Sequence, residues 1–126
     1  MLTMQRDTKQ RSAIRDVFAR CKRPLSPKEL LKEASRQIPQ LGIATVYRNI
    51  KSMVEKKELV AIEIPGEAPR YALPGNESHS LFICNKTGRV FFLDDKKFQL
   101  KVPRSSKDFK IKHFNLFVFG ESKAEV

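Results

Sequence analysis

The sequence predicts an α+β fold in two parts, with three helices and a β-hairpin over residues 1–75 and a small α/β unit over residues 76–126. Two observations support this division. Apolar residues recur at helical spacing up to about residue 57, and then change to the short, alternating runs that are typical of strands. In addition, 126 residues suffice for one domain or two very small ones, and are too few for an enzyme with a deep cleft between large lobes.

Capping signals mark the first two helices. We expect Thr8 to cap a first helix of about four turns, whose apolar stripe ends at Cys21. Residues 26–29 form a capping box in which Ser26 is the N-cap and Glu29 follows three positions later. The second helix ends before Pro39. Its predicted core residues are Leu30, Leu31, Ala34 and Ile38.

A tight connection at residues 39–42 leads into a third helix, predicted over residues 43–57. One face of this helix is an apolar stripe of Val46, Ile50, Met53 and Val54. The opposite face is polar and contains Thr45, Tyr47, Arg48, Lys51 and Ser52. A solvated face needs polar residues in any case. Near the start of a helix that follows a short turn, however, a hydroxyl, a phenol and a guanidinium can together reach base edges and phosphates.

Residues 59–64 and 70–73 are short, strand-like runs joined by the turn residues 65–69. Three helices followed by a hairpin make a winged helix-turn-helix. Glu63 and Glu67 give this wing a net negative charge, so we expect it to contribute little to the binding of an anion.

The second half predicts a hairpin from runs 81–84 and 90–93, a short helix from Asp94 to about Lys101, an alternating run at 109–114 and a strand at 115–119. Eight of the nine phenylalanines lie here. Because so small a sheet cannot bury them alone, we expect a homodimer that covers them. Two-fold symmetry would then place two recognition helices about 34 Å apart on DNA.

The chain is strongly basic, with 25 Lys and Arg against 14 Asp and Glu, and residues 1–58 hold 14 of the basic residues against six acidic ones. This predicts an anionic partner, double-stranded DNA first and an acidic membrane surface second. No apolar run is long enough to span a membrane and no signal peptide is evident, so we expect a cytoplasmic protein. No nucleophile-base set or phosphate loop indicates an enzyme or a small-molecule substrate.

Residues 42–50, GIATVYRNI, strongly resemble the G-x-A-T-V-Y-R-x-x signature of the ferric uptake regulator (Fur) family. Residues 8–11 are similar to that family's T-x-Q-R motif, and residues 24–30 to its P-x-S-A-x-E-L stretch. Weaker similarity continues through residues 81–90 and 116–120, so that it spans nearly the whole chain. Ordered matches on both sides of the A-T-V-Y-R core make the resemblance specific.

The resemblance implies a homodimeric bacterial transcription regulator, with a DNA-binding winged helix over residues 1–75 and a dimerisation domain over 76–126. It implies that Tyr47 and Arg48 contact the major groove, that Arg6 reaches the minor groove and that Arg11 supports phosphate binding. Together with the polar face of the third helix, the predicted DNA-binding residues are Arg6, Arg11, Thr45, Tyr47, Arg48, Lys51 and Ser52.

The sequence departs from the family at its structural zinc site, which needs four thiolates in two C-x-x-C pairs. On the resemblance, the first pair falls at Cys84 and Thr87 and the second at Ser122 and Glu125, so three of the four thiolates are missing. A hydroxyl does not replace a thiolate as a ligand for zinc. We therefore expect no structural zinc.

The regulatory metal site of the family needs a cluster of histidines and carboxylates, and this chain has two histidines. A residual site would have to combine His79, His113, Cys84 and a carboxylate. The alternative gives these residues ordinary structural roles, and we favour it because isolated ligands bind transition metals weakly. The sequence thus predicts a Fur-type regulator without a metal or other cofactor.

Two further functions remain open from the sequence. A basic protein of this size can bind RNA or the ribosome, although no RNP-like motif is present. A DNA-binding protein can also use Cys21 or Cys84 as a thiol redox sensor, which depends on a pKa and an exposure that the sequence does not contain. Competition between duplex DNA and RNA distinguishes the first alternative from the regulator.

Overall fold

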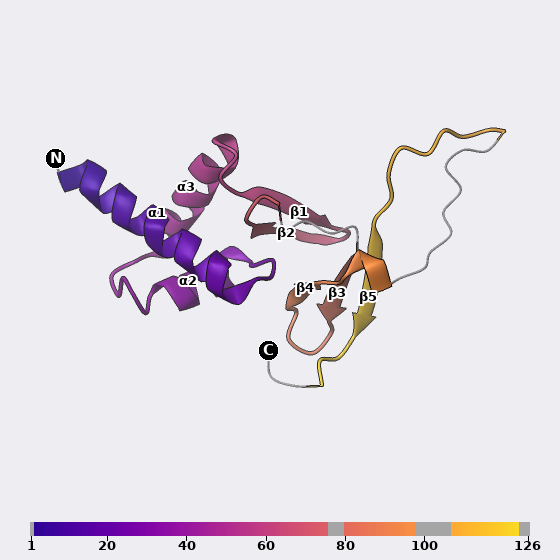
Figure 1. The fold of residues 1–126 in the computed structure, drawn as a ribbon. Coiled ribbons are helices and arrows are strands. Elements are labelled where there is room, and N and C mark those ends of the chain that lie inside the picture. The colour runs from indigo at the N-terminus through magenta and orange to yellow at the C-terminus, as the bar shows by residue number, and fades with distance from the viewer. Residues whose placement is uncertain (1, 76–79, 98–106, 124–126) are drawn as a thin grey trace. The chain divides into compact units, whose positions relative to one another are not determined.

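The computed structural model of the chain describes residues 2–75, 80–97 and 107–123. It forms two compact units, Met1–Glu77 and Ser78–Val126, and each is described by itself (Figure 1). The first unit contains three helices and a hairpin, and the second contains three strands, which confirms the α+β class. Within the described ranges, no helix has the length and apolar character that a membrane span requires.

The first helix, α1 (Leu2–Cys21), begins six residues before the predicted cap, so the assignment of Thr8 as an N-cap is wrong. Residues 2–7 contain neither proline nor glycine, and nothing in them stops the helix from extending past Thr8, which is an exposed residue inside it. The predicted apolar stripe is confirmed, since four of its members are buried: Ala13, Ile14, Val17 and Phe18.

The second helix, α2 (Pro27–Ala34), has the predicted capping box. The backbone N–H of Glu29 donates to Oγ of Ser26 at 3.2 Å, and the backbone N–H of Ser26 donates to Oε1 of Glu29 at the same distance. The helix ends at Ala34, well before Pro39, because the chain turns at Ser35, whose hydroxyl donates to the Leu31 carbonyl at 2.6 Å.

The third helix, α3 (Ile43–Glu55), is two residues shorter than predicted. Lys57 adopts a left-handed conformation with φ 62°, and its N–H donates to the Val54 carbonyl at 3.0 Å. The N–H of Glu58 donates to the Met53 carbonyl at 2.7 Å. These two hydrogen bonds form a Schellman motif, which satisfies the last carbonyls of α3 and turns the chain toward the hairpin.

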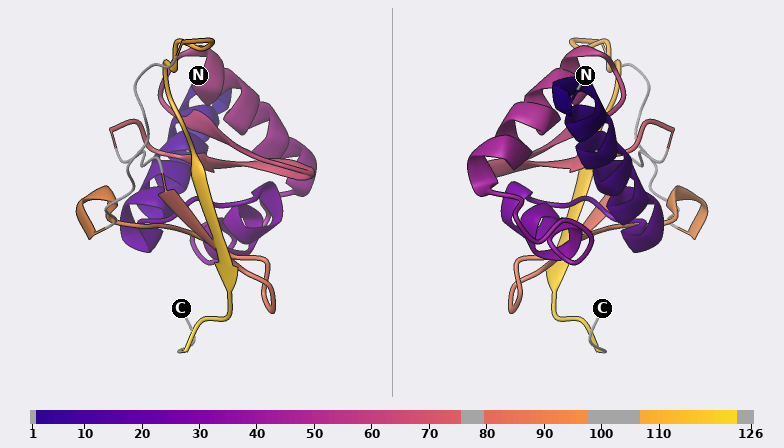
Figure 2. Two further views of the ribbon diagram at one scale, coloured as in Figure 1. Left: turned by 90° about the vertical axis from the view of Figure 1, so that its right-hand side faces the viewer. Right: turned by 90° about the vertical axis from the view of Figure 1, so that its left-hand side faces the viewer.

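The predicted wing is an antiparallel hairpin of β1 (Val60–Ile64) and β2 (Glu67–Ala72). Its turn has two residues rather than the predicted five, and Gly66 supplies a φ of 76° there. Leu25 and Tyr71 exchange two backbone hydrogen bonds of 2.9 Å, which attach the segment before α2 to the hairpin. All three helices contribute to one apolar core. Figure 2 shows the ribbon of these helices from two opposite sides.

The second unit is a three-stranded sheet in the order β4-β3-β5, made of β3 (Ser80–Cys84), β4 (Val90–Phe92) and β5 (Leu116–Gly120). β3 pairs with β4 antiparallel and with β5 parallel. The predicted short helix is a single 3-10 turn at Asp95–Lys97, and the rest of its expected length lies outside the described residues.

In the described part of the chain, the alternating run at residues 109–114 forms no strand, and Lys110 is in a single β-bridge. Phe109 is 70% exposed and Phe114 is 38% exposed. Alternation alone does not make a strand, because a strand also needs a surface to cover and an edge to pair with.

Replacing Lys57 with glycine is expected to raise the free energy of unfolding by about 0.5–1 kcal/mol, because glycine adopts the left-handed conformation without the steric cost of a Cβ. Urea titration followed by tyrosine fluorescence measures this in the first unit, since Tyr47 and Tyr71 are the only tyrosines. The neighbouring Lys56→Gly, at φ −86°, is the control and should lower stability. Equal changes in the free energy of unfolding for Lys57→Gly and Lys56→Gly would contradict the left-handed conformation of Lys57.

Candidate nucleic-acid interface

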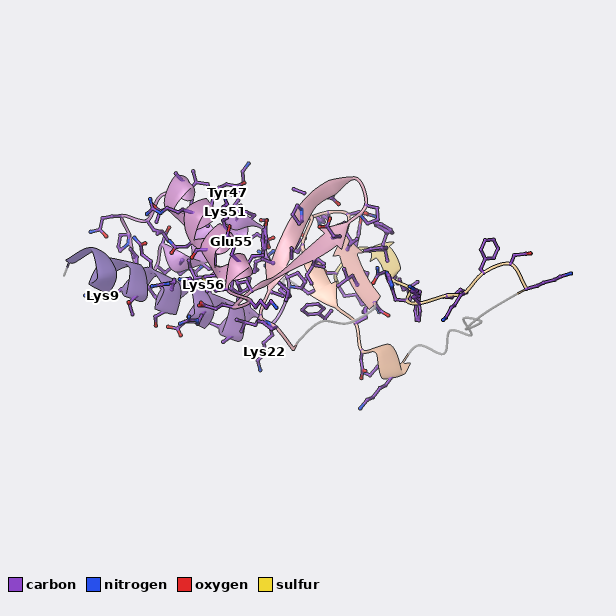
Figure 3. The ribbon with its side chains drawn as sticks, turned by 90° about the horizontal axis from the view of Figure 1, so that it is seen from above. Lys9, Lys22, Tyr47, Lys51, Glu55 and Lys56 are labelled. Carbon is purple, nitrogen blue, oxygen red and sulfur yellow. The ribbon has the colours of Figure 1, made fainter. Side chains whose placement is uncertain are left out.

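The packing of α3 determines which of its residues face solvent. Its buried stripe, with at most 3% exposure, consists of Val46, Ile50 and Met53. Tyr47, Arg48 and Lys51 lie off this stripe and are exposed, Tyr47 by 53%. Figure 3 shows Tyr47 and Lys51 following each other along α3. Three of the predicted DNA-binding residues therefore share one accessible face of this helix.

Two other predicted residues of α3 are less accessible. Thr45 and Ser52 are half-buried, and both have carbonyls that accept hydrogen bonds inside the helix. The Thr45 carbonyl accepts one from Nδ2 of Asn49 at 2.9 Å, and the Ser52 carbonyl accepts one from the backbone of Lys56 at 3.0 Å. They flank the exposed face of Tyr47, Arg48 and Lys51 rather than form its centre.

The remaining two predicted residues, Arg6 and Arg11, both lie on α1. Arg6 is part of a continuous helix and not of an extended arm, and its side chain is outside the described part. Arg11 is half-buried. Five residues separate them, which places them roughly 140° apart around a helix of about 3.6 residues per turn.

The sequence analysis missed a buried polar contact between α1 and α3. Nδ2 of Asn49 donates to Oε1 of Gln10 at 3.2 Å, and Asn49 and Gln10 are only 7% and 8% exposed. Asn49 follows Arg48 directly, and Gln10 precedes Arg11. Asn49 thus uses its amide group to join the two helices that carry the predicted DNA contacts. The available signal was a pair of amides at positions otherwise reserved for core residues.

The arginines of the first unit differ in whether a glutamate pairs with them. Five arginines have a glutamate oxygen within 3.4 Å: Arg15 with Glu58, Arg20 and Arg36 with Glu33, Arg23 with Glu29, and Arg70 with Glu67. Among the described residues, neither Arg48 nor Lys51 has a carboxylate partner of this kind. The charges of Arg48 and Lys51 are therefore available to an anionic ligand on the exposed face of α3.

A second cluster surrounds Cys84 at the end of β3. The thiol is buried, with Cys84 2% exposed. The Thr87 hydroxyl and the backbone N–H groups of Ser122, Thr87 and Lys86 are its hydrogen-bond partners. The Thr87 hydroxyl contributes most, and together these bonds lower the pKa of the Cys84 thiol from 9.0 to about 6, against the opposing effect of burial. The cluster favours a thiolate at neutral pH.

These residues do not fit a metal site. Cys84, Thr87 and Ser122 meet at the end of the sheet, but only one of them supplies a thiolate. Within the described ranges, no three His, Cys, Asp or Glu side chains come together as a ligand set. His113 is exposed, whereas His79 and Glu125 lie outside those ranges. No metal-binding role can be assigned to the described residues.

A model of the ferric uptake regulator family matches residues 3–119 of the chain. The chain is 28% identical over 85 residues to the ferric uptake regulation protein of Campylobacter jejuni, which covers 66% of this chain and 54% of that protein. It is 26% identical over 98 residues to the protein of the same name from Haemophilus influenzae, covering 76% and 67% of the two. The chain thus spans about half the length of the Campylobacter relative.

The fold is similar to that of the Helicobacter pylori ferric uptake regulator, with a TM-score of 0.61 and 25% sequence identity. The match covers 91% of this chain and 78% of that chain. The Helicobacter protein has three functional metal-binding sites. The same fold therefore occurs with metal sites in that protein and with the poor donor set around Cys84 in this one.

Replacing Asn49 with leucine is expected to lower the free energy of unfolding of the first unit by about 1–3 kcal/mol, because Oε1 of Gln10 loses its donor in a buried place. The double change Asn49→Leu with Gln10→Leu should recover most of this loss, since replacing both partners leaves no unsatisfied group. Urea unfolding followed by tyrosine fluorescence measures both.

Gln37→Leu provides the control, because Gln37 is an exposed amide in the turn after α2. It should change stability by less than about 0.5 kcal/mol. If the loss of stability in the double variant equalled the sum of the losses from Asn49→Leu and Gln10→Leu alone, Gln10 and Asn49 would not interact.

The lowered pKa of Cys84 predicts a pH dependence. Because the folded protein favours the thiolate, this contribution to stability is complete above pH 9, declines as the pH falls and is lost below about pH 6. Thr87→Val, which removes the main hydrogen bond, should therefore lower the melting temperature more at pH 8 than at pH 5.5. In a Cys21→Ser background, it should also move the midpoint of iodoacetamide reactivity from about 6 toward 9. If the difference in melting temperature between wild type and Thr87→Val increased as the pH falls, the lowered pKa of Cys84 would be contradicted.

Proposed function

The chain belongs to the ferric uptake regulator family, and from this we propose that it is a bacterial, sequence-specific DNA-binding transcription regulator that acts in the cytoplasm as a homodimer and without a regulatory metal. The observation that carries the proposal is the exposed face of α3, where Tyr47, Arg48 and Lys51 project from a helix that follows a short turn. Its activity is binding rather than catalysis.

The chemistry of this face suits a major groove. The guanidinium of Arg48 can donate to O6 and N7 of guanine together, and the ring of Tyr47 can pack on a thymine methyl group. Lys51, one turn later, can contact a phosphate, as can Thr45 and Ser52 at the margins. On the family resemblance, Arg6 is assigned to the minor groove and Arg11 to the phosphates of the DNA backbone. Glu63 and Glu67 keep the wing from a large share of the binding.

The second unit supports the homodimer. β5 is an edge strand whose residues are half-buried or exposed, and Phe119, next to its last residue, is 59% exposed. An exposed aromatic edge of this kind is a surface for pairing with another chain. A second copy is the partner that the family membership suggests. A symmetric pair would present two copies of α3 to sites about 34 Å apart.

The surroundings of Cys84 support metal independence. The positions that the resemblance assigns to further thiolates hold Thr87 and Ser122; the Thr87 hydroxyl and the backbone N–H of Ser122 donate to the Cys84 sulfur. These bonds join the turn after β3 to the residues after β5, which is the connection that four thiolates around zinc would make. The chain thus has a metal-free means of tying these two segments together.

The proposal predicts that Arg48→Ala weakens binding to a duplex obtained by sequence selection by about 1–3 kcal/mol, with little change for a random duplex. Arg20→Ala removes an exposed arginine near the end of α1 and is the control, with an expected effect of less than about 0.5 kcal/mol. Fluorescence anisotropy at fixed salt measures each constant, with and without chelator.

Loss of binding in chelator would overturn metal independence, and a monomeric mass by light scattering in chelator would overturn the dimer. Unchanged affinity of Arg48→Ala would remove Arg48 from the recognition surface. Preference for an RNA competitor over every duplex would favour the RNA-binding alternative.

A further inference from the structure

A groove of about 560 Å³ lies between α3 and the hairpin of the first unit. Its lining is drawn from α3, β1 and β2: Tyr47, Arg48, Ile50, Lys51, Val54, Glu55, Ala61 and Tyr71. Figure 3 shows three of these, Tyr47, Lys51 and Glu55, in succession along α3. The volume falls within the range of about 300–1,000 Å³ that is usual for small-molecule sites.

The floor of the groove is apolar. Ile50 is 3% exposed at its base, Val54 and Tyr71 are half-buried in its walls, and Ala61 faces it from β1. Water in such a place finds few hydrogen-bond partners, so an apolar ring or chain that displaces it gains free energy. The floor therefore favours a hydrophobic group.

The rim of the groove is charged and asymmetric. Arg48 and Lys51 stand at one end, and in the described part of the chain no ion pair engages either of them. Glu55 follows Lys51 by one helical turn, which places a negative charge toward the other end. This arrangement attracts a single anionic group to the Arg48 end and disfavours a second one beside Glu55.

We propose that this groove is a binding site for a small amphipathic anion, with a flat aromatic or short aliphatic body and one carboxylate, sulfonate or phosphate group. The anionic group lies between Arg48 and Lys51, where a guanidinium and an ammonium can both donate to it. The apolar body lies over Ile50 and Val54, against the ring of Tyr71.

The effect of ligand binding rests on the proposed function, because Tyr47, Arg48 and Lys51 are also the proposed DNA contacts. One guanidinium cannot hold a guanine and the anion together. The ligand therefore competes with DNA and raises its apparent dissociation constant by the factor 1 + [L]/Kd. The groove thus gives a chain with no assigned metal site a direct way to respond to a metabolite of this class.

The test uses 8-anilinonaphthalene-1-sulfonate, an aromatic sulfonate that fluoresces in apolar surroundings, titrated into the full chain. Ala61→Glu places a carboxylate on the groove wall and is expected to weaken binding of the dye at least tenfold. Ala68→Glu is the matched control, because Ala68 is an exposed alanine of the same hairpin outside the groove, and its effect should stay within twofold. Equal binding by wild type and Ala61→Glu, or no binding by wild type, would overturn the site.

A second arm measures anisotropy of a labelled duplex as the dye is added. Displacement of the duplex by wild type, reduced at least tenfold in potency by Ala61→Glu, supports competition. Simultaneous binding of dye and duplex would overturn it. If dye binding depends on Ala61 but no duplex is bound in the absence of dye, the proposed function fails and the groove stands. If the duplex binds and the dye does not, the groove fails and the proposed function stands.

Discussion

Val46, Ile50 and Met53 of α3 lie in the same apolar core as Ile14 and Phe18 of α1, and this burial fixes the rotation of α3 about its own axis. Burying one large aliphatic side chain is worth roughly 1.5–3 kcal/mol. A rotation of α3 by one residue would expose these side chains and would push charged ones into the core, which costs far more than α3 could regain elsewhere. The exposed face of the helix is therefore a consequence of its buried face. The hydrogen bond from Asn49 to Gln10 lies in this interface and adds direction to a contact that burial alone leaves non-directional.

The sequence predicts those parts of the fold whose causes are local. The stripe of α3 and the capping box of α2 depend on spacings of three and four residues, and the structure confirms both. The start of α1 could not be predicted from Thr8, because a capping residue acts as a cap only where the preceding residues leave the helix. The contact between Gln10 and Asn49 joins residues 39 positions apart, and an isolated sequence holds no direct signal for such a pair. The exposed face of Tyr47, Arg48 and Lys51 was predictable because it is the complement of a local stripe, whereas the groove beside it depends on how the hairpin packs.

Around Cys84 the zinc ligand set of the family is incomplete, but the two segments that would carry it still meet. From the sequence, Cys84 is a small buried hydrophobe, and the structure does bury it. The structure also brings Thr87 and Ser122 to the sulfur, although 35 residues separate Ser122 from Thr87. The parallel pairing of β3 with β5 ends at Cys84 and Gly120, which places both segments at one end of the sheet. This register brings the residues after β3 and those after β5 together at that end of the sheet.

The proposed DNA contacts and the proposed anion site share one face of α3. Glutamates pair with Arg15 and Arg20 of α1, with Arg23 and Arg36 on either side of α2, and with Arg70, the basic residue of the hairpin. A wing of this charge attracts phosphates only weakly, so the proposed DNA binding depends on α3 and α1. The same cations border an apolar groove on the side of the wing. Regulation by competition at this face requires no signal to pass from the second unit to the first. It needs only that the two proposed ligands share Arg48, which is exposed on α3 and lines the groove.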